Sequence, residues 1–154
     1  MKKAFVIGGL LVAAVSVSGC ATVTRGKTDT VTFTSSPSGA AVKTSMGTTC
    51  QTPCHMEISR KQAFYAAFTK GKKTRQVRVN PTTSAEGVAT GAGNVIAGGL
   101  IGIAVDASSG ATLDHVPNPV HVDFSQPQAK AQQVAMEHYK KVKAAKQKKP
   151  AKSE

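Results

Sequence analysis

The 154-residue chain has no tryptophan, and aromatic residues make up only 5% of it. A hydrophobic core therefore has to be built from valine, isoleucine, alanine and a few phenylalanines. Acidic residues are also scarce, with eight Asp and Glu against twenty Lys and Arg. No nucleophile, base and orienting group occur at a recognisable spacing, so the sequence predicts no enzyme and no cofactor. The acids before the C-terminal segment are scattered: Asp29, Glu57, Glu86, Asp106, Asp114 and Asp123.

The N-terminus has the features of an export signal. Lys2 and Lys3 give a positive start, and the apolar run over residues 4–15 is too short to span a bilayer as a mature helix. Small residues then stand directly before a cysteine in Val17-Ser18-Gly19-Cys20. This motif resembles the lipobox of bacterial lipoproteins. The alternative is an ordinary secretory signal that ends near a cysteine.

The lipobox resemblance implies a signal peptide over residues 1–19 and acylation of Cys20. Several acyl chains make a stable anchor, because each buried methylene contributes about 0.8 kcal/mol. Ala21 and Thr22 follow the cysteine, without the aspartate that favours retention at the inner membrane in such lipoproteins. We therefore expect a bacterial cell-envelope protein, anchored by lipid in the outer membrane and facing the periplasm. That compartment is oxidising, which permits disulfides.

The charge of the chain restricts its partners. The formal net charge is +12, and loss of Lys2 and Lys3 with the signal leaves +10. Such an excess favours anionic partners: lipid headgroups, lipopolysaccharide or peptidoglycan. Export from the cytoplasm argues against nucleic acid.

Short β-branched segments alternate with turn residues through the first part of the mature chain. Lys70-Gly71-Lys72-Lys73 is typical of a hairpin turn. Regular short strands predict a mainly β fold, a small antiparallel β-sandwich. The predicted strands cover residues 31–34, 40–44, 55–59, 64–69, 74–79 and, after a glycine-rich insert, 120–124.

This region contains the pieces Ser36-Pro37-Ser38-Gly39-Ala40-Ala41-Val42, Gly47, Thr52-Pro53 and Lys70-Gly71. Together they resemble the PEGA-type domain of bacterial surface proteins. The chain departs from the family in having Ser38 where the family's name implies glutamate, and Lys72 where an aromatic residue commonly follows the glycine. The resemblance implies a β-domain over residues 20–125 that serves as a binding or spacer module without a catalytic centre.

Cys50-Gln51-Thr52-Pro53-Cys54 is the one local motif with reactive side chains. A disulfide between Cys50 and Cys54 is the simplest interpretation, because a turn at Pro53 can bring the two α-carbons to about 5.5 Å. A metal site that includes His55 is an alternative, as is a thiol redox site. Zinc sites usually combine two paired motifs, and redox pairs have two intervening residues rather than three. We therefore predict a disulfide and no metal; the remaining histidines have no ligand spacing: His115, His121 and His138.

The run from Gly87 to Val105 carries no charge, and we predict a glycine-rich helix over residues 86–106. Its small residues at i, i+4 spacing allow close helix packing, as in membranes. Packing on the sheet is the preferred interpretation, because glycines weaken an isolated helix and an apolar span conflicts with delivery to the outer membrane. One alternative for this run is a membrane-inserting or oligomerising helix. For the protein as a whole, a further alternative is an envelope hydrolase or its inhibitor.

The C-terminal segment, residues 126–154, contains eight lysines against two glutamates. Residues 129–146 lack Gly and Pro and are rich in helix formers, so this basic tail is predicted to be helical or disordered. Val134, Met136 and Val142 form no continuous apolar stripe, and we expect no firm packing on the domain. The tail is interpreted as an anion-binding arm or, alternatively, as a solvated extension that aids solubility. Its candidate anion-binding residues are Lys140, Lys141, Lys143, Lys146, Lys148 and Lys149.

Overall fold

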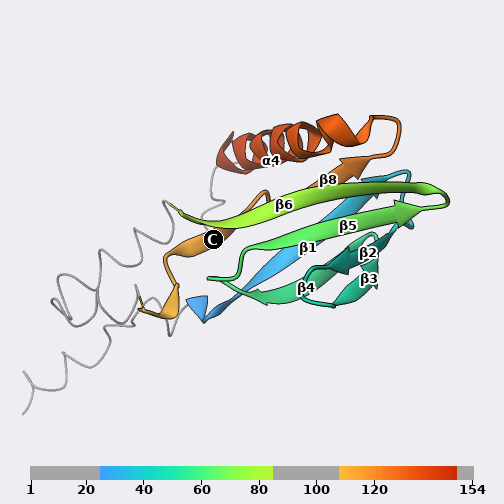
Figure 1. Cartoon of the computed structure of the whole chain (residues 1–154). Coiled ribbons are helices and arrows are strands. Elements are labelled where there is room, and N and C mark those ends of the chain that lie inside the picture. The colour runs from blue at the N-terminus through green and yellow to red at the C-terminus, as the bar shows by residue number, and fades with distance from the viewer. Residues whose placement is uncertain (1–24, 85–107, 149–154) are drawn as a thin grey trace, which may run out of the picture. The chain divides into compact units, whose positions relative to one another are not determined.

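The computed structural model describes residues 25–84 and 108–148 (Figure 1). Residues 28–82 and 113–148 belong to one compact unit that contains both sheets and the C-terminal helix, and the other described residues belong to a second unit. In the second unit Arg25 Nη1 donates to the Ala111 carbonyl at 2.8 Å, and the Ser84 amide donates to the Thr112 carbonyl at 3.1 Å. Cys20 and the predicted helix at 86–106 lie outside the described residues.

Two sheets form the β unit. The smaller sheet has the order β4-β1-β8, with β4 antiparallel and β8 parallel to β1. The larger sheet has the order β3-β2-β5-β6-β7. The strands are β1 (Thr28–Ser36), β2 (Ala41–Thr44), β3 (Thr49–Gln51), β4 (Cys54–Ser59), β5 (Phe64–Lys70), β6 (Lys73–Thr83), β7 (Leu113–Val116) and β8 (Val120–Asp123). A short 3-10 helix, η1 (Gln128–Lys130), leads into α4 (Ala131–Lys148).

The core lies between the two sheets. Val31 and Phe33 are fully buried, while the threonines between and beside them face outward, as strand alternation requires. Phe33 contacts Phe64 and Phe68 with ring centroids 6.3 Å and 6.1 Å apart. Aliphatic residues of both sheets complete the cluster: Val42, Ile58, Ala66, Val77, Val79, Val120 and Val122.

The mainly β, sandwich-like fold predicted from the sequence is confirmed. The hairpin between β5 and β6 is also confirmed, with Lys70 opposite Lys73 and Gly71 at a φ of 57° that favours glycine. The prediction of a purely antiparallel sandwich misses the parallel pairing of β8 with β1. It also misses β3 and β7.

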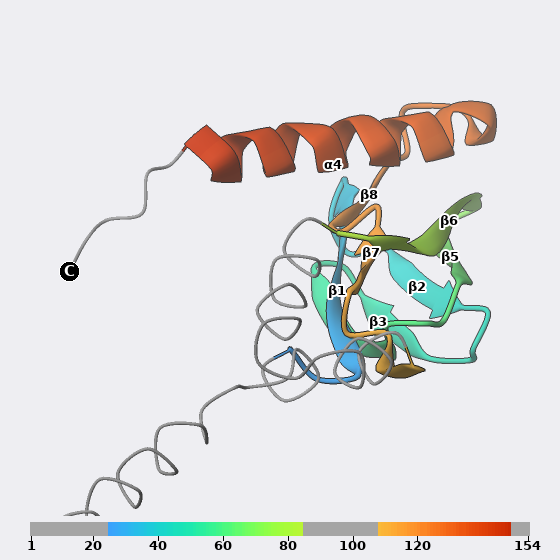
Figure 2. The same cartoon turned by 90° about the vertical axis from the view of Figure 1, so that its left-hand side faces the viewer.

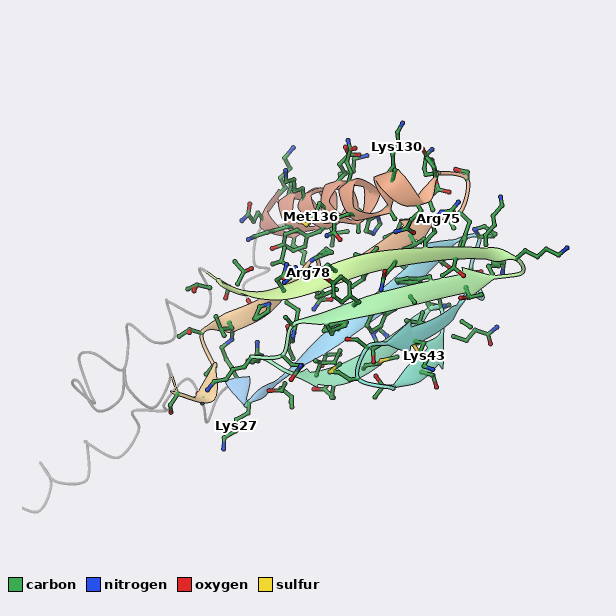
Figure 3. The ribbon with its side chains drawn as sticks, in the orientation of Figure 1. Lys27, Lys43, Arg75, Arg78, Lys130 and Met136 are labelled. Carbon is green, nitrogen blue, oxygen red and sulfur yellow. A yellow bond between two sulfur atoms is a disulfide. The ribbon has the colours of Figure 1, made fainter. Side chains whose placement is uncertain are left out.

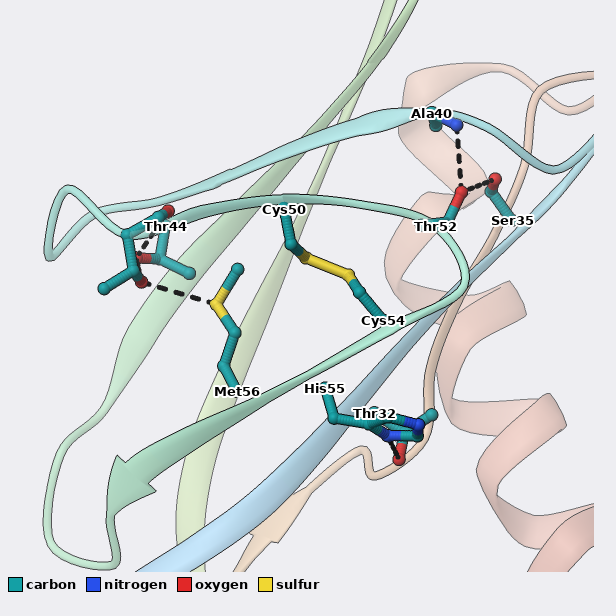
Figure 4. Close-up of a disulfide and its surroundings, with 10 residues drawn as sticks. Thr32, Ser35, Ala40, Thr44, Cys50, Thr52, Cys54, His55 and Met56 are labelled. Atoms are coloured by element: carbon teal, nitrogen blue, oxygen red, sulfur yellow. Dashed lines mark hydrogen bonds between the residues drawn. A yellow bond between two sulfur atoms is a disulfide. The ribbon is translucent and has the colours of Figure 1, made fainter.

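The disulfide joins the edge strands of the two sheets on one side of the sandwich (Figure 4). Cys50 in β3 and Cys54 in β4 are bonded, with their α-carbons 6.3 Å apart. Between them Thr52 is only 4% exposed, and its hydroxyl accepts from the Ala40 amide at 2.9 Å and bonds the Ser35 hydroxyl at 2.6 Å. The predicted Cys50–Cys54 bridge is confirmed, and it spans the point where the chain passes from one sheet to the other.

Replacing Cys50 and Cys54 together by alanine is expected to lower the free energy of unfolding by roughly 2 kcal/mol, the entropy value for so short a loop. The fold should survive, because the cysteines are only partly buried beside a core cluster that the two substitutions leave intact. Urea unfolding of the full chain, followed by circular dichroism, measures the difference. Complete loss of folding, or no change in stability, would contradict this role of the bridge.

Candidate functional site

The C-terminal helix packs on the sandwich at its first two turns. Ala131 and Ala135 are 3% and 0% exposed, belong to the core cluster, and lie four residues apart on one face of α4. Figure 2 shows α4 lying across the side of the sandwich where β8 and β6 run. The expectation that this segment does not pack firmly is therefore wrong. Its contact stripe is made of alanines, whose small side chains allow close approach but give a weak hydrophobic signal.

Two glutamines connect the start of this helix to the edge of β6. Gln128 accepts from the Gln76 amide at 2.8 Å and donates to the Gln76 carbonyl at 3.1 Å. Gln132 makes the same pair of bonds to Arg78, at 2.8 Å and 3.1 Å. Residues four apart on a helix rise about 6 Å and residues two apart on a strand about 6.7 Å, so the two spacings match. The side-chain amides thus hydrogen-bond the edge of β6 as a neighbouring strand would.

The second half of α4 carries the lysines predicted to bind anions. Residues 143–148 are all exposed, as are Lys140 and Lys141. We define the lysine arm as residues 140–148, with Lys140, Lys141, Lys143, Lys146 and Lys148. Successive residues turn by about 100° around a helix, so these lysines are spread over roughly 220° of its circumference. The remaining sector carries Val142 and Ala145. Lys149 lies outside the described residues.

The lysine arm has little acidic compensation. Glu137 is the one acid in α4, and its carboxylate accepts a hydrogen bond from Gln133 at 3.0 Å. Lys143 lies beside Tyr139, with Nζ 3.4 Å from the hydroxyl and 5.7 Å from the ring centroid. Within the described ranges, no arm lysine forms an ion pair. The arm is therefore a compact group of exposed positive charges on a helix that is fixed at its other end.

A pair of histidines joins the middle of α4 to the smaller sheet. The rings of His121 in β8 and His138 in α4 are stacked with centroids 4.3 Å apart, and Thr34 Oγ1 lies 2.9 Å from His121 Nδ1. Burial and the neighbouring His138 lower the pKa of His121, against a smaller opposing effect of Asp123. Protonation of both rings would place two like charges across the contact between helix and sheet.

A buried group of charges fixes β7 against the start of β1. His115 is 1% exposed; its Nδ1 lies 3.1 Å from an Asp29 carboxylate oxygen and its Nε2 lies 3.0 Å from the Gln62 carbonyl. Arg60 forms an ion pair with Asp114 at 2.7 Å and lies 3.8 Å from Asp29. Burial alone would raise the pKa of Asp29, but hydrogen bonds from His115 and the charge of Arg60 lower it overall.

The other predicted alternatives are placed as follows. His55, considered above as a metal ligand, instead lies 3.0 Å from the Thr32 hydroxyl through Nδ1. Among residues 25–84 and 108–148, no three His, Cys, Asp or Glu side chains are grouped to hold a metal ion. No helix in the same ranges combines the length and apolarity needed to cross a membrane.

Comparison with protein-family models, with curated proteins and with solved structures finds no match to this chain.

Sequence reasoning missed the contacts that hold the lysine arm in place. Each histidine was considered alone, and nothing in the sequence pairs His121 with His138 across seventeen residues. The glutamine contacts leave one faint signal, the i, i+4 spacing of Gln128 and Gln132 at the start of a helical segment.

Lowering the pH below about 6.5 is expected to weaken the packing of α4, because the His121 imidazole binds its proton more readily in the unfolded chain. This stability is present above that pH and is lost as the pH falls toward the lower folded-state pKa, at about 1.4 kcal/mol per unit of pKa difference. Asp29, whose pKa is lowered from 3.8, titrates below this range. Urea unfolding of the full chain at several pH values measures the slope.

His121→Gln should flatten this pH dependence, while His55→Gln removes an exposed histidine outside the stack and serves as the control. An unchanged slope in His121→Gln, or an equal change in His55→Gln, would contradict the assignment.

Proposed function

We propose that this protein is a non-enzymatic lipoprotein of the bacterial cell envelope. In this proposal acylated Cys20 anchors the chain in the outer membrane, facing the periplasm. The β-sandwich then holds the first turns of α4 in place, and the lysine arm binds anionic polymers or lipids of the envelope. The observation that carries the proposal is the exposed lysine arm on a helix whose first turns belong to the core.

The distribution of apolar groups indicates that the arm binds by charge. A helix that lies in a membrane interface needs a continuous apolar face opposite its charges. The large exposed hydrophobic residues of the described chain are Met46 and Tyr65, and neither lies in α4. Lysines spread over more than half of the circumference of the arm suit a flexible anionic polymer better than a flat layer of headgroups. Peptidoglycan is therefore the preferred ligand over anionic lipid or lipopolysaccharide.

Cys20→Ala is expected to release the protein from membranes or to leave an uncleaved precursor, because acylation requires the thiol. Fractionation of cells and the mass of the mature chain measure both effects. Unchanged fractionation with a normal mature mass would contradict the lipid anchor, whatever the arm binds.

Replacing Lys141, Lys146 and Lys148 together by alanine is expected to weaken binding to purified peptidoglycan by roughly 100-fold, from about 1 kcal/mol per lysine at an anionic surface. Binding by the wild-type chain should also fall steeply toward 1 M salt, where the screening length shortens to about 3 Å. Co-sedimentation of the full chain with peptidoglycan measures both.

The matched control replaces three lysines outside α4, Lys27, Lys61 and Lys72, with the same loss of charge. The control should bind almost as the wild type does. Equal weakening in the two triple variants would assign the binding to net charge instead of to the arm. Stronger binding to anionic vesicles than to peptidoglycan would change the preferred ligand.

A further inference from the structure

The strands β2, β5 and β6 of the larger sheet carry basic residues and no acidic ones. Strands β2, β3, β5 and β6 contain no Asp or Glu, although β1, β4 and β8 of the smaller sheet each contain one. Lys43 of β2 and Arg78 of β6 both alternate outward from buried neighbours and are exposed. Figure 3 shows both residues on the strands of this sheet. The four strands β2, β3, β5 and β6 are therefore together basic without an acid, and the acid of the fifth strand, Asp114 in β7, forms an ion pair with Arg60.

Arg78 is held in place on this face from two directions. Its backbone amide and carbonyl are bonded to Gln132, at 2.8 Å and 3.1 Å. Its Nε donates to Asn80 Oδ1 at 2.9 Å, and its guanidinium carbon lies 5.6 Å from the Tyr65 ring centroid. The two terminal nitrogens donate to no residue of the described ranges. An oriented guanidinium with this edge free presents two parallel donors, the arrangement that binds two oxygens of one anion.

The strand register places a short side chain, that of Ala67, among the longer side chains near Arg78. Tyr65 is opposite Arg78, and Ala67, two residues along β5, is opposite Gln76 on one side and Lys43 on the other. Ala67 has only a methyl side chain and is half-buried between these longer neighbours. Tyr65, which is 43% exposed, lies on the same face next to Arg78. The residues around Ala67 supply positive charge (Lys43 and Arg78), a side-chain amide (Gln76) and an aromatic ring (Tyr65).

We propose that this face contains an anion-binding site, separate from the lysine arm, in which Arg78 binds two oxygens of a phosphate or carboxylate group and Lys43 adds charge. The shared ligand chemistry is a pair of equivalent anionic oxygens. Phosphate would come from lipid headgroups or lipopolysaccharide, and carboxylate from the peptides of the cell wall. The site stands independently of the proposed function of the arm, because it uses different residues on a different element.

The test is nuclear magnetic resonance of the full chain with nitrogen-15 in its four arginines, Arg25, Arg60, Arg75 and Arg78. Arg78→Lys removes one Nε signal and so assigns it. Sodium phosphate and sodium acetate are each added at constant ionic strength, so that screening does not change. We expect a saturable shift of the Arg78 signal with at least one anion at millimolar concentration. The tighter anion identifies the source.

Matched variants separate the site from general charge. Arg78→Lys keeps the charge but loses the paired donors, and anion binding measured by calorimetry should weaken roughly tenfold or more. Lys72→Ala, which removes a charge from the hairpin turn, should leave the Arg78 shift unchanged, as should the triple variant of the arm. A shift that never saturates, or equal weakening in Lys72→Ala, would overturn the proposal. Absence of peptidoglycan binding by the wild-type chain, together with a saturable Arg78 shift, would count against the arm alone.

Discussion

Two sheets packed face to face leave two open sides, and the hydrophobic layer between them must be shielded from water on both. On one side the chain itself passes from β3 to β4, and the Cys50–Cys54 bridge closes the passage. On the other side the four-residue β7 borders the much longer β6, and the chain passes from β7 directly to β8 of the smaller sheet. There Ala131 and Ala135 of α4 enter the core cluster. Helix α4 therefore helps to close this second side of the core.

The requirement for closure explains why a strongly basic segment is ordered at all. A lysine-rich helix of this length has little reason to be stable in isolation, since most helical stability in proteins comes from packing. Its first turns gain stability from the alanine contact, the Gln128 and Gln132 hydrogen bonds, and the histidine stack. The later turns extend the helix from this fixed base. A structural need at one end thus positions a charged surface at the other.

Sequence reasoning succeeded where burial follows a simple period. Alternation of apolar and polar residues located β1, β5 and β6, and turn chemistry located the hairpin at Gly71. It failed at β3, which has three residues, and at β7, whose inward residue is His115. A histidine is buried there because Asp29 and the Gln62 carbonyl provide hydrogen-bond partners for its two ring nitrogens, and those partners come from distant parts of the chain. Compositional patterns cannot contain that information.

The candidate sites divide in the same way. The Cys50–Cys54 pair and the lysines of α4 could be predicted, because proximity in sequence or composition alone defines them. The setting of Arg78 could not, since it depends on Tyr65 in one strand and on Gln132 in a helix more than fifty residues away. Local residue types indicate what chemistry is available, whereas orientation comes from tertiary contacts.

The glutamine contacts also affect how strand β6 can pair with other molecules. An uncovered strand edge presents free amides and carbonyls, which readily pair with the edge of another molecule. Gln128 and Gln132 occupy those groups at Gln76 and Arg78 with side chains. Proteolysis ahead of η1 would therefore do more than remove a basic extension: it would open both the edge of β6 and the alanine-lined side of the core. The C-terminal helix thus protects the molecule against growth into strand-paired aggregates.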